Sequence, residues 1–98
     1  MKLEDLKTAL EPACREFQVK RLDAFGSVAL GTSTRTGDVD LLVEFRADVS
    51  HPARCFFGLL HRAEDTLGCK VDLQTLSGLR NPYFRRRVLE ERVPLYEG

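Results

Sequence analysis

Gly26-Ser27, followed after ten residues by Asp38-Val39-Asp40 and the apolar run Leu41-Leu42-Val43, is the stretch that decides the fold. A small turn residue and a hydroxyl residue can present backbone N–H groups to phosphates at the start of a helix, where the helix dipole favours anions. Two aspartates at i and i+2 on a strand point the same way. Such carboxylates repel each other unless a hard divalent cation lies between them, and Mg²⁺ takes oxygen ligands from carboxylates and phosphates. The stretch therefore predicts a nucleotide-and-metal site.

The bulk composition limits what surrounds this site. Ninety-eight residues with 43% hydrophobic content predict a single domain over 1–98, because a chain of this length buries roughly 60–65% of its unfolded surface. Fifteen basic and fifteen acidic residues give a net charge of zero, so we expect neither independent nucleic-acid binding nor attraction to an anionic membrane. The longest apolar runs are far shorter than the roughly 20 residues that span a bilayer. Residues 1–5 carry acids where a signal peptide would be apolar, which indicates a cytoplasmic protein.

Three cysteines, Cys14, Cys55 and Cys69, are odd in number and lack C-x-x-C spacing. A disulfide framework and a zinc ribbon are therefore not indicated. We expect reduced thiols that serve mainly in packing.

The first half of the chain reads as a helix and two strands. Apolar residues recur at three and four between Leu3 and Phe17, which predicts an amphipathic helix that Pro12 is expected to bend. Val19 to Phe25 alternates, with Val19, Arg21, Asp23 and Phe25 on one face, and predicts a strand that ends at Gly26. Residues 27–31 allow about one helical turn, and a polar loop leads into a strand over 38–45 whose apolar centre is typical of a strand covered on both faces.

The second half adds two helices and a strand. Pro52 is a favourable first helical residue, and helical spacing continues to a stop at Gly68. Residues 71–73 predict a short strand, and Asn81-Pro82 predicts the start of a last helix that runs to about Arg92. The order is αβ(α)βαβα, which indicates an α/β or α+β domain with a small mixed sheet flanked by helices.

Together these segments resemble the minimal nucleotidyltransferases of the polymerase-beta superfamily. The resemblance rests on Gly26-Ser27-Val28-Ala29-Leu30-Gly31, on the stretch from Asp38 to Phe45, and on Leu67-Gly68-Cys69-Lys70-Val71-Asp72-Leu73. It continues through Arg80-Asn81-Pro82 and ends in Val93-Pro94-Leu95-Tyr96. A G-S-x10-D-x-D pattern at strand, turn, helix and strand junctions is much more specific than a lone D-x-D, although each motif taken singly is usually only a turn or a polar strand face.

The resemblance implies a nucleotidyltransferase fold and a set of site residues. Asp38, Asp40 and Asp72 would be the catalytic carboxylates and would bind two Mg²⁺ ions, while Gly26 and Ser27 would hold the triphosphate of ATP. Two metal ions can stabilise the entering and leaving oxygens of an in-line displacement at the α-phosphorus. Asp72 could also accept the proton of the acceptor hydroxyl. Its strand would have to run beside the strand over 38–45, an adjacency that the sequence does not establish.

Two positions depart from the family pattern. Leu30 stands where the family often has Arg, and Gly37 stands where it often has Ser before the first aspartate. The first change removes one possible phosphate or packing contact, and the second removes a hydroxyl that could orient the acidic turn. Arg35 is a candidate nucleotide-binding residue that could supply the positive charge, with a solvated loop arginine as the alternative interpretation.

The expected activity is Mg²⁺-dependent transfer of AMP from ATP to a hydroxyl. Proteins of this kind commonly act as antitoxins that modify a tyrosine of a helical HEPN-type ribonuclease toxin, so such a toxin is the expected partner, and an oligomer is possible. One alternative is a catalytically weak module that neutralises a partner by contact, which Leu30 and Gly37 would favour. Another is a transferase that acts on a small molecule or an RNA end.

Other polar residues favour ordinary roles. His51 and His61 suit capping or surface positions better than metal binding. Arg85-Arg86-Arg87 could meet a polyanion or an acidic partner, but Glu90 and Glu91 lie at i+4 and can pair with these arginines, which favours a solvated helix face.

Overall fold

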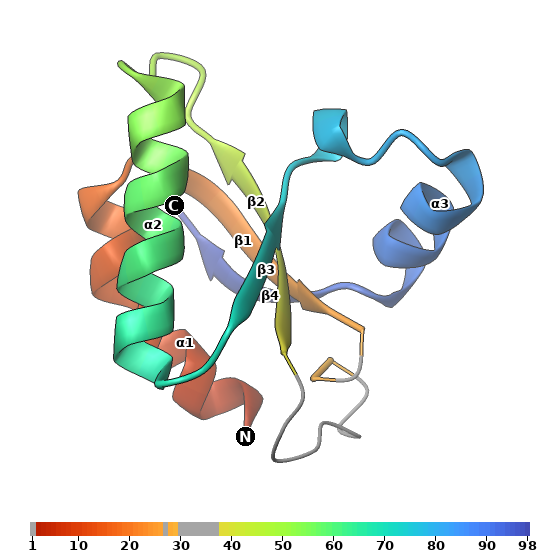
Figure 1. Ribbon diagram of the computed structural model, residues 1–98, viewed down its shortest axis with the longest axis horizontal. Coiled ribbons are helices and arrows are strands. Elements are labelled where there is room, and N and C mark those ends of the chain that lie inside the picture. Colours follow the sequence, from red (N-terminus) through yellow and green to blue (C-terminus); the bar gives the residue numbers. More distant parts are fainter. Residues whose placement is uncertain (1, 27, 30–37) are drawn as a thin grey trace.

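The protein is a mixed α/β fold in which helices cover a four-stranded sheet (Figure 1). The computed structural model describes residues 2–26, 28–29 and 38–98. Its elements are α1 (Leu3–Glu16), β1 (Val19–Phe25), β2 (Val39–Phe45), α2 (Pro52–Leu67), β3 (Val71–Gln74), the 3₁₀ turn η1 (Leu76–Gly78), α3 (Pro82–Glu91) and β4 (Val93–Glu97). The predicted fold class is confirmed. The helical turn expected over 27–31 lies largely outside the described residues.

The sheet has the strand order β3-β2-β1-β4. β1 lies in the centre and pairs antiparallel with both β2 and β4, whereas β2 pairs in parallel with β3. A parallel pair needs a crossover, and α2 supplies it. The strand that carries Asp72 therefore does run beside the strand that carries Asp40.

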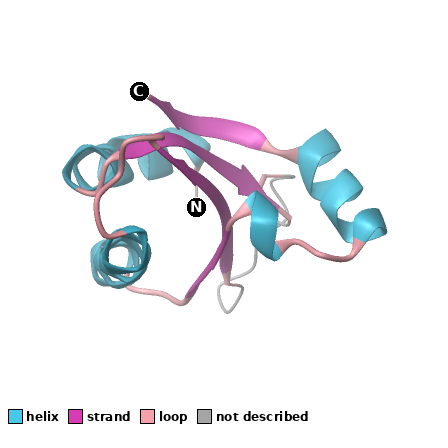
Figure 2. Cartoon of the chain, turned by 90° about the horizontal axis from the view of Figure 1, so that it is seen from above, coloured by secondary structure: helices cyan, strands magenta, loops and turns pink. Residues whose placement is uncertain are grey.

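One face of the sheet carries the main core. Helix α1 buries Leu6, Leu10, Ala13 and Cys14, and α2 buries Cys55, Leu59 and Ala63. Both helices pack on the same side of the sheet, opposite η1 and α3 (Figure 2). Helix α1 continues to Glu16 although Pro12 lies inside it, because its apolar stripe keeps the last turn packed against the sheet. No helix in the described part of the chain is long and apolar enough to cross a bilayer.

The opposite face is only partly covered. A smaller apolar cluster joins Phe25, Leu42, Leu79 and Val88. Val88 is the one residue of α3 that is fully buried, so α3 rests on a narrow contact. Between this helix and the ends of the central strands, the face of the sheet stays open.

The alternation predicted for β1 is wrong at its start. The register shifts between Val19 and Arg21, because an irregularity there turns Val19 to the same core as Leu22 and Ala24. From Arg21 onward the alternation holds. Asp23, expected on a strand face, is 1% exposed and contacts two arginines described below.

Strand β4 was not predicted as an element. Its five residues include Pro94, and a proline argues against a strand except at an edge. β4 is such an edge strand, pairing only with β1 in the sheet order. Tyr96 pairs with Leu22, and Pro94 pairs with Asp23 after a register shift.

Candidate functional site

Two carboxylates lie side by side on the open face of the sheet. Asp40 of β2 is in register with Asp72 of β3 on one side and with Phe25 of β1 on the other. Residues in register on adjacent strands project to the same face. Strand pairing thus brings together two acids that are 32 positions apart in the sequence.

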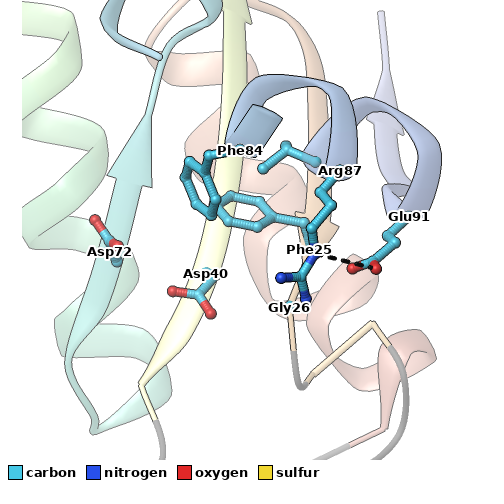
Figure 3. Close-up of a pocket in the computed structure, with 8 residues that line it drawn as sticks. Phe25, Gly26, Asp40, Asp72, Phe84, Arg87 and Glu91 are labelled. Carbon is cyan, nitrogen blue, oxygen red and sulfur yellow. Dashed lines mark ion pairs between the residues drawn. The ribbon is translucent and has the colours of Figure 1, made fainter. Parts of the chain in front are cut away.

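These residues line an open pocket of about 310 Å³ between the sheet and α3. Figure 3 shows the order across it: Asp72 at one side, Asp40 in the middle, and Gly26 at the other side. Helix α3 forms the upper wall of the pocket in this view. The residues of α3 that line it are Phe84, Arg87, Val88 and Glu91.

Gly26 is required at the turn where β1 ends. Its φ is +69°, a left-handed conformation that side chains rarely adopt. A Cβ at this position would lie 2.5 Å from Oδ2 of Asp40. The absence of a side chain at residue 26 therefore lets the Asp40 carboxylate lie directly against the backbone of the turn.

The position of Asp40 in the pocket changes its pKa clearly from the usual value. Burial, together with the negative charges of Asp72 and Asp38, raises the pKa of the Asp40 carboxyl above its usual value. The ionised form of Asp40 is thus destabilised until a cation compensates it. Oxygen donors in a cluster of like charge are the chemistry that Mg²⁺ selects, so the residues present fit a divalent cation.

The other two carboxylates differ from Asp40 in their surroundings. Gln74 donates a hydrogen bond of 2.8 Å from Nε2 to Oδ1 of Asp72, which fixes one oxygen of this exposed side chain. Asp38 lies just before β2 with an exposed side chain and is not among the residues that line the pocket. Over 2–26, 28–29 and 38–98, no three His, Cys, Asp or Glu side chains form a ready-made metal cluster. Asp40 and Asp72 are brought together, and the role of Asp38 stays a prediction.

Several predicted residues cannot be placed. Ser27 and Arg35, expected at the triphosphate, lie outside the described residues, as do Leu30 and Gly37. His51 is the N-cap residue of α2, with a φ of 56°, an exposed side chain and no side-chain capping hydrogen bond, so of the two roles predicted for it the surface position is the one confirmed.

Helix α3 contributes pocket residues that the sequence did not identify. Asn81 accepts hydrogen bonds from the backbone N–H groups of Tyr83 and Phe84, which confirms the predicted start of this helix. The predicted i+4 pairs are also present: Arg86 with Glu90 at 3.4 Å and Arg87 with Glu91 at 3.7 Å.

The two ion pairs look alike in sequence, but only Arg87 and Glu91 line the pocket. The Phe84 ring packs edge-on against Phe25 at 6.2 Å and, with buried Val88, sets the helix rotation. Phe84, Arg87, Val88 and Glu91 are spaced i, i+3, i+4, i+7, and this spacing in the sequence could have predicted that they share one face of the helix.

Comparison with known proteins gives a consistent result. The nucleotidyltransferase domain family matches residues 6–95. A Methanocaldococcus jannaschii protein named "putative protein adenylyltransferase" is 33% identical over 78 residues, which cover 80% of this chain and 78% of that protein. A second protein of the same organism and name is 32% identical over 93 residues, covering 95% and 97% of the two chains.

Solved structures share the fold. That of a "putative minimal nucleotidyltransferase" has a TM-score of 0.78 at 34% identity and covers 96% of both chains. A toxin–antitoxin structure with AMP-PNP has a TM-score of 0.72 at 21% identity, covering 94% of this chain and 73% of that one. A tri-AMPylated Shewanella oneidensis HEPN toxin in complex with its MNT antitoxin gives 0.67 at 15% identity, covering 98% and 73%. At these lower identities the likeness concerns the fold alone.

Proposed function

The chain belongs to the nucleotidyltransferase domain family, and from this premise we propose that it transfers AMP from ATP to a hydroxyl group of a partner protein. Family membership makes it an enzyme of the nucleotidyltransferase class. The observation that carries the proposal is the in-register pair of Asp40 and Asp72 beside the left-handed turn at Gly26. That arrangement provides acidic oxygens next to a backbone turn open to phosphates.

The reaction moves one phosphoryl centre. The acceptor oxygen forms a bond to the α-phosphorus of ATP while the bond from that phosphorus to the bridging oxygen breaks, and pyrophosphate leaves. The acceptor hydroxyl gives up its proton, for which the Asp72 carboxylate is the proposed base. Gly26, with Ser27 and Arg35 as further predicted contacts, would hold the phosphate chain at the other side of the pocket.

Asp40 and Asp72, with Asp38, would hold Mg²⁺. The ion supplies positive charge to the phosphate oxygens and favours an in-line displacement. The raised pKa of Asp40 supports this assignment, because a carboxylate destabilised by neighbouring negative charge gains most from a bound cation.

The acceptor is proposed from the relatives. Two relatives that carry the name "putative protein adenylyltransferase" are similar over most of this chain. A protein with the same fold, an MNT antitoxin, occurs in a complex with a HEPN toxin. We infer that a HEPN-type toxin is the partner and that its tyrosine hydroxyl is the acceptor. A pocket open on one side can admit a side chain presented by another protein.

Label transfer tests the proposal directly. The chain is incubated with Mg²⁺, the product of the neighbouring gene as the candidate partner, and ATP labelled at either the α- or the γ-phosphate. We expect label on the partner only from α-labelled ATP, with loss of transfer on chelation and in Asp40→Asn and Asp72→Asn. Asp65→Asn changes an exposed aspartate of α2, outside the pocket, and serves as the matched control.

Two results would contradict the proposal. Label arriving from γ-labelled ATP would indicate phosphorylation instead of AMP transfer. Neutralisation of an active toxin by the Asp40→Asn variant, without label, would indicate an inhibitor that acts by contact.

A further inference from the structure

The pocket contains an imbalance of charge. Three acids, Asp40, Asp72 and Glu91, line it, and Arg87 is the one cationic side chain among its described lining residues. A nucleoside triphosphate is a polyanion, so it requires positive charge from a metal ion, from N–H donors or from basic side chains. Among the described lining residues, Arg87 is the side chain that can provide it.

The placement of Arg87 is specific. Figure 3 shows its side chain extending from α3 toward Gly26, on the side of Asp40 away from Asp72. This is the side where the turn after β1 presents its backbone. The guanidinium therefore faces the end of the pocket proposed for the phosphates, and Asp72 marks the end proposed for the acceptor.

Arg87 forms a weak ion pair with Glu91 through Nε of its guanidinium. Nε of Arg87 lies 3.7 Å from Oε1 of Glu91, at the outer limit of an ion pair, and the arginine side chain is 75% exposed. The two terminal nitrogens of the guanidinium form a planar fork that suits phosphate oxygens. The side chain of Glu91 is 33% exposed and also lines the pocket.

We propose that Arg87 binds the phosphate chain of the nucleotide at the pyrophosphate end, and that the phosphate competes with Glu91 for the Arg87 guanidinium. The proposal rests on the nucleotidyl-transfer function proposed above and adds a ligand contact to it. The guanidinium leaves a weak pairing with Glu91 for charge-assisted hydrogen bonds to phosphate. Arg87 thereby selects donors that carry a β-phosphate over nucleoside monophosphates.

The neighbouring pair gives a matched control. Arg86 and Glu90 have the same i, i+4 spacing on the same helix, with side chains 81% and 66% exposed, but they do not line the pocket. Arg86→Gln changes the net charge as Arg87→Gln does. A general attraction of α3 for anions would affect the two variants equally.

Binding of three probes by the full chain tests the proposal: ATP with Mg²⁺, pyrophosphate with Mg²⁺, and AMP, each followed by calorimetry. In Arg87→Gln we expect affinity for ATP and pyrophosphate to fall about ten- to hundredfold, the range of a lost charge-assisted contact, with less than about threefold change for AMP. Arg87→Lys should recover part of the loss. Glu91→Gln should tighten ATP binding several-fold, and Arg86→Gln and Glu90→Gln should stay within about twofold of wild type.

The outcomes separate this inference from the proposed function. Equal losses in Arg86→Gln and Arg87→Gln, or unchanged ATP binding in Arg87→Gln, overturn the role of Arg87 while leaving nucleotidyl transfer standing. Loss of ATP and pyrophosphate binding in Arg87→Gln supports that role even if the HEPN-type acceptor proves wrong. If the wild-type chain binds neither ATP nor pyrophosphate, both proposals fail.

Discussion

The carboxylate of Asp40 occupies the space that a side chain on residue 26 would need. A Cβ on Gly26 would lie 2.5 Å from Oδ2 of Asp40, which is closer than real Cβ contacts allow. The turn that ends β1 and the strand β2 therefore approach each other so closely at Oδ2 of Asp40 that residue 26 has no room for a side chain. At this contact the proposed phosphate end of the pocket, at Gly26, meets Asp40, one of the proposed metal ligands.

Gly26→Ala should abolish most transfer. The alanine methyl must displace Asp40, and the left-handed backbone adds strain of about 1 kcal/mol or more. We expect transfer to fall by at least about a hundredfold, a typical loss for displaced catalytic groups, with a modest decrease in melting temperature.

Gly68→Ala separates the two effects. Gly68 has almost the same φ, +68°, but a Cβ there would meet no atom within 4 Å. This variant should lose about 1 kcal/mol of stability and keep its activity. Equal loss of activity in both glycine variants would show that backbone strain, and not the contact with Asp40, is responsible.

Asp40→Asn should stabilise the metal-free protein at pH 7 while removing transfer. The folded state raises the pKa of Asp40, so the contribution of this carboxyl to stability is present below its unfolded pKa and is lost as pH rises through the folded value. The asparagine carries no such penalty at neutral pH, so its advantage should shrink as pH falls through the raised pKa of Asp40 and should be gone below about pH 4. Thermal melts in chelator measure this, and added Mg²⁺ should stabilise the wild type more than the variant.

Local patterns predicted most of the elements. Helix α2 begins at Pro52, which favours a first helical turn, and stops at Gly68, which adopts the left-handed conformation of a C-cap. Asn81 likewise marks the start of α3 through its side-chain hydrogen bonds. Each of these helix ends is determined by the residue itself and by its neighbours in the sequence, so it can be predicted without knowledge of the tertiary structure.

Long-range relationships were not predictable in the same way. That Asp72 lies beside Asp40 depends on the parallel pairing of β2 with β3, which α2 and the main core establish. That Arg87 enters the pocket while Arg86 does not depends on how Val88 docks α3 against the sheet. Strand β4 was not predicted because Pro94 argues against a strand in the sequence, whereas the structure shows that β4 pairs with β1 at an edge of the sheet.

Asp23→Asn should destabilise the fold by about 1–3 kcal/mol, because it removes the negative charge from a buried ion-pair group. Asp23 accepts hydrogen bonds from Nε of Arg21 at 3.0 and 2.9 Å and lies 3.5 Å from Nη1 of Arg92, just after α3. Both arginines are about 30% exposed and can partly turn to water, which limits the loss. For a domain of this size the melting temperature should fall by roughly 4–8 °C per kcal/mol.

Glu44→Gln is the comparison for Asp23→Asn. Glu44 of β2 pairs with Lys20 of β1 at 3.5 Å, but the side chains are 49% and 60% exposed. Its loss should stay below about 1 kcal/mol. Similar destabilisation by the two substitutions would mean that burial of Asp23 adds nothing to its ion pairs.

Cys14 should make the fold sensitive to alkaline pH. Burial, with a smaller effect of the charge on Glu11, raises the pKa of the Cys14 thiol to about 12, whereas an unfolded thiol ionises near 8.5. The stability that the neutral thiol contributes is therefore complete below about pH 8.5 and is lost as pH rises toward 12. By pH 10 the loss should reach about 1–2 kcal/mol.

Cys14→Ala isolates this contribution. The substitution should lower stability by about 1 kcal/mol at pH 7 through lost packing, and the deficit relative to wild type should shrink or reverse by pH 10 because alanine does not ionise. Denaturant melts at the two pH values measure the difference, and iodoacetamide at pH 8 should label partly exposed Cys69 well before Cys14. A deficit that stays constant from pH 7 to pH 10 would show that the Cys14 thiolate is accommodated in the folded core.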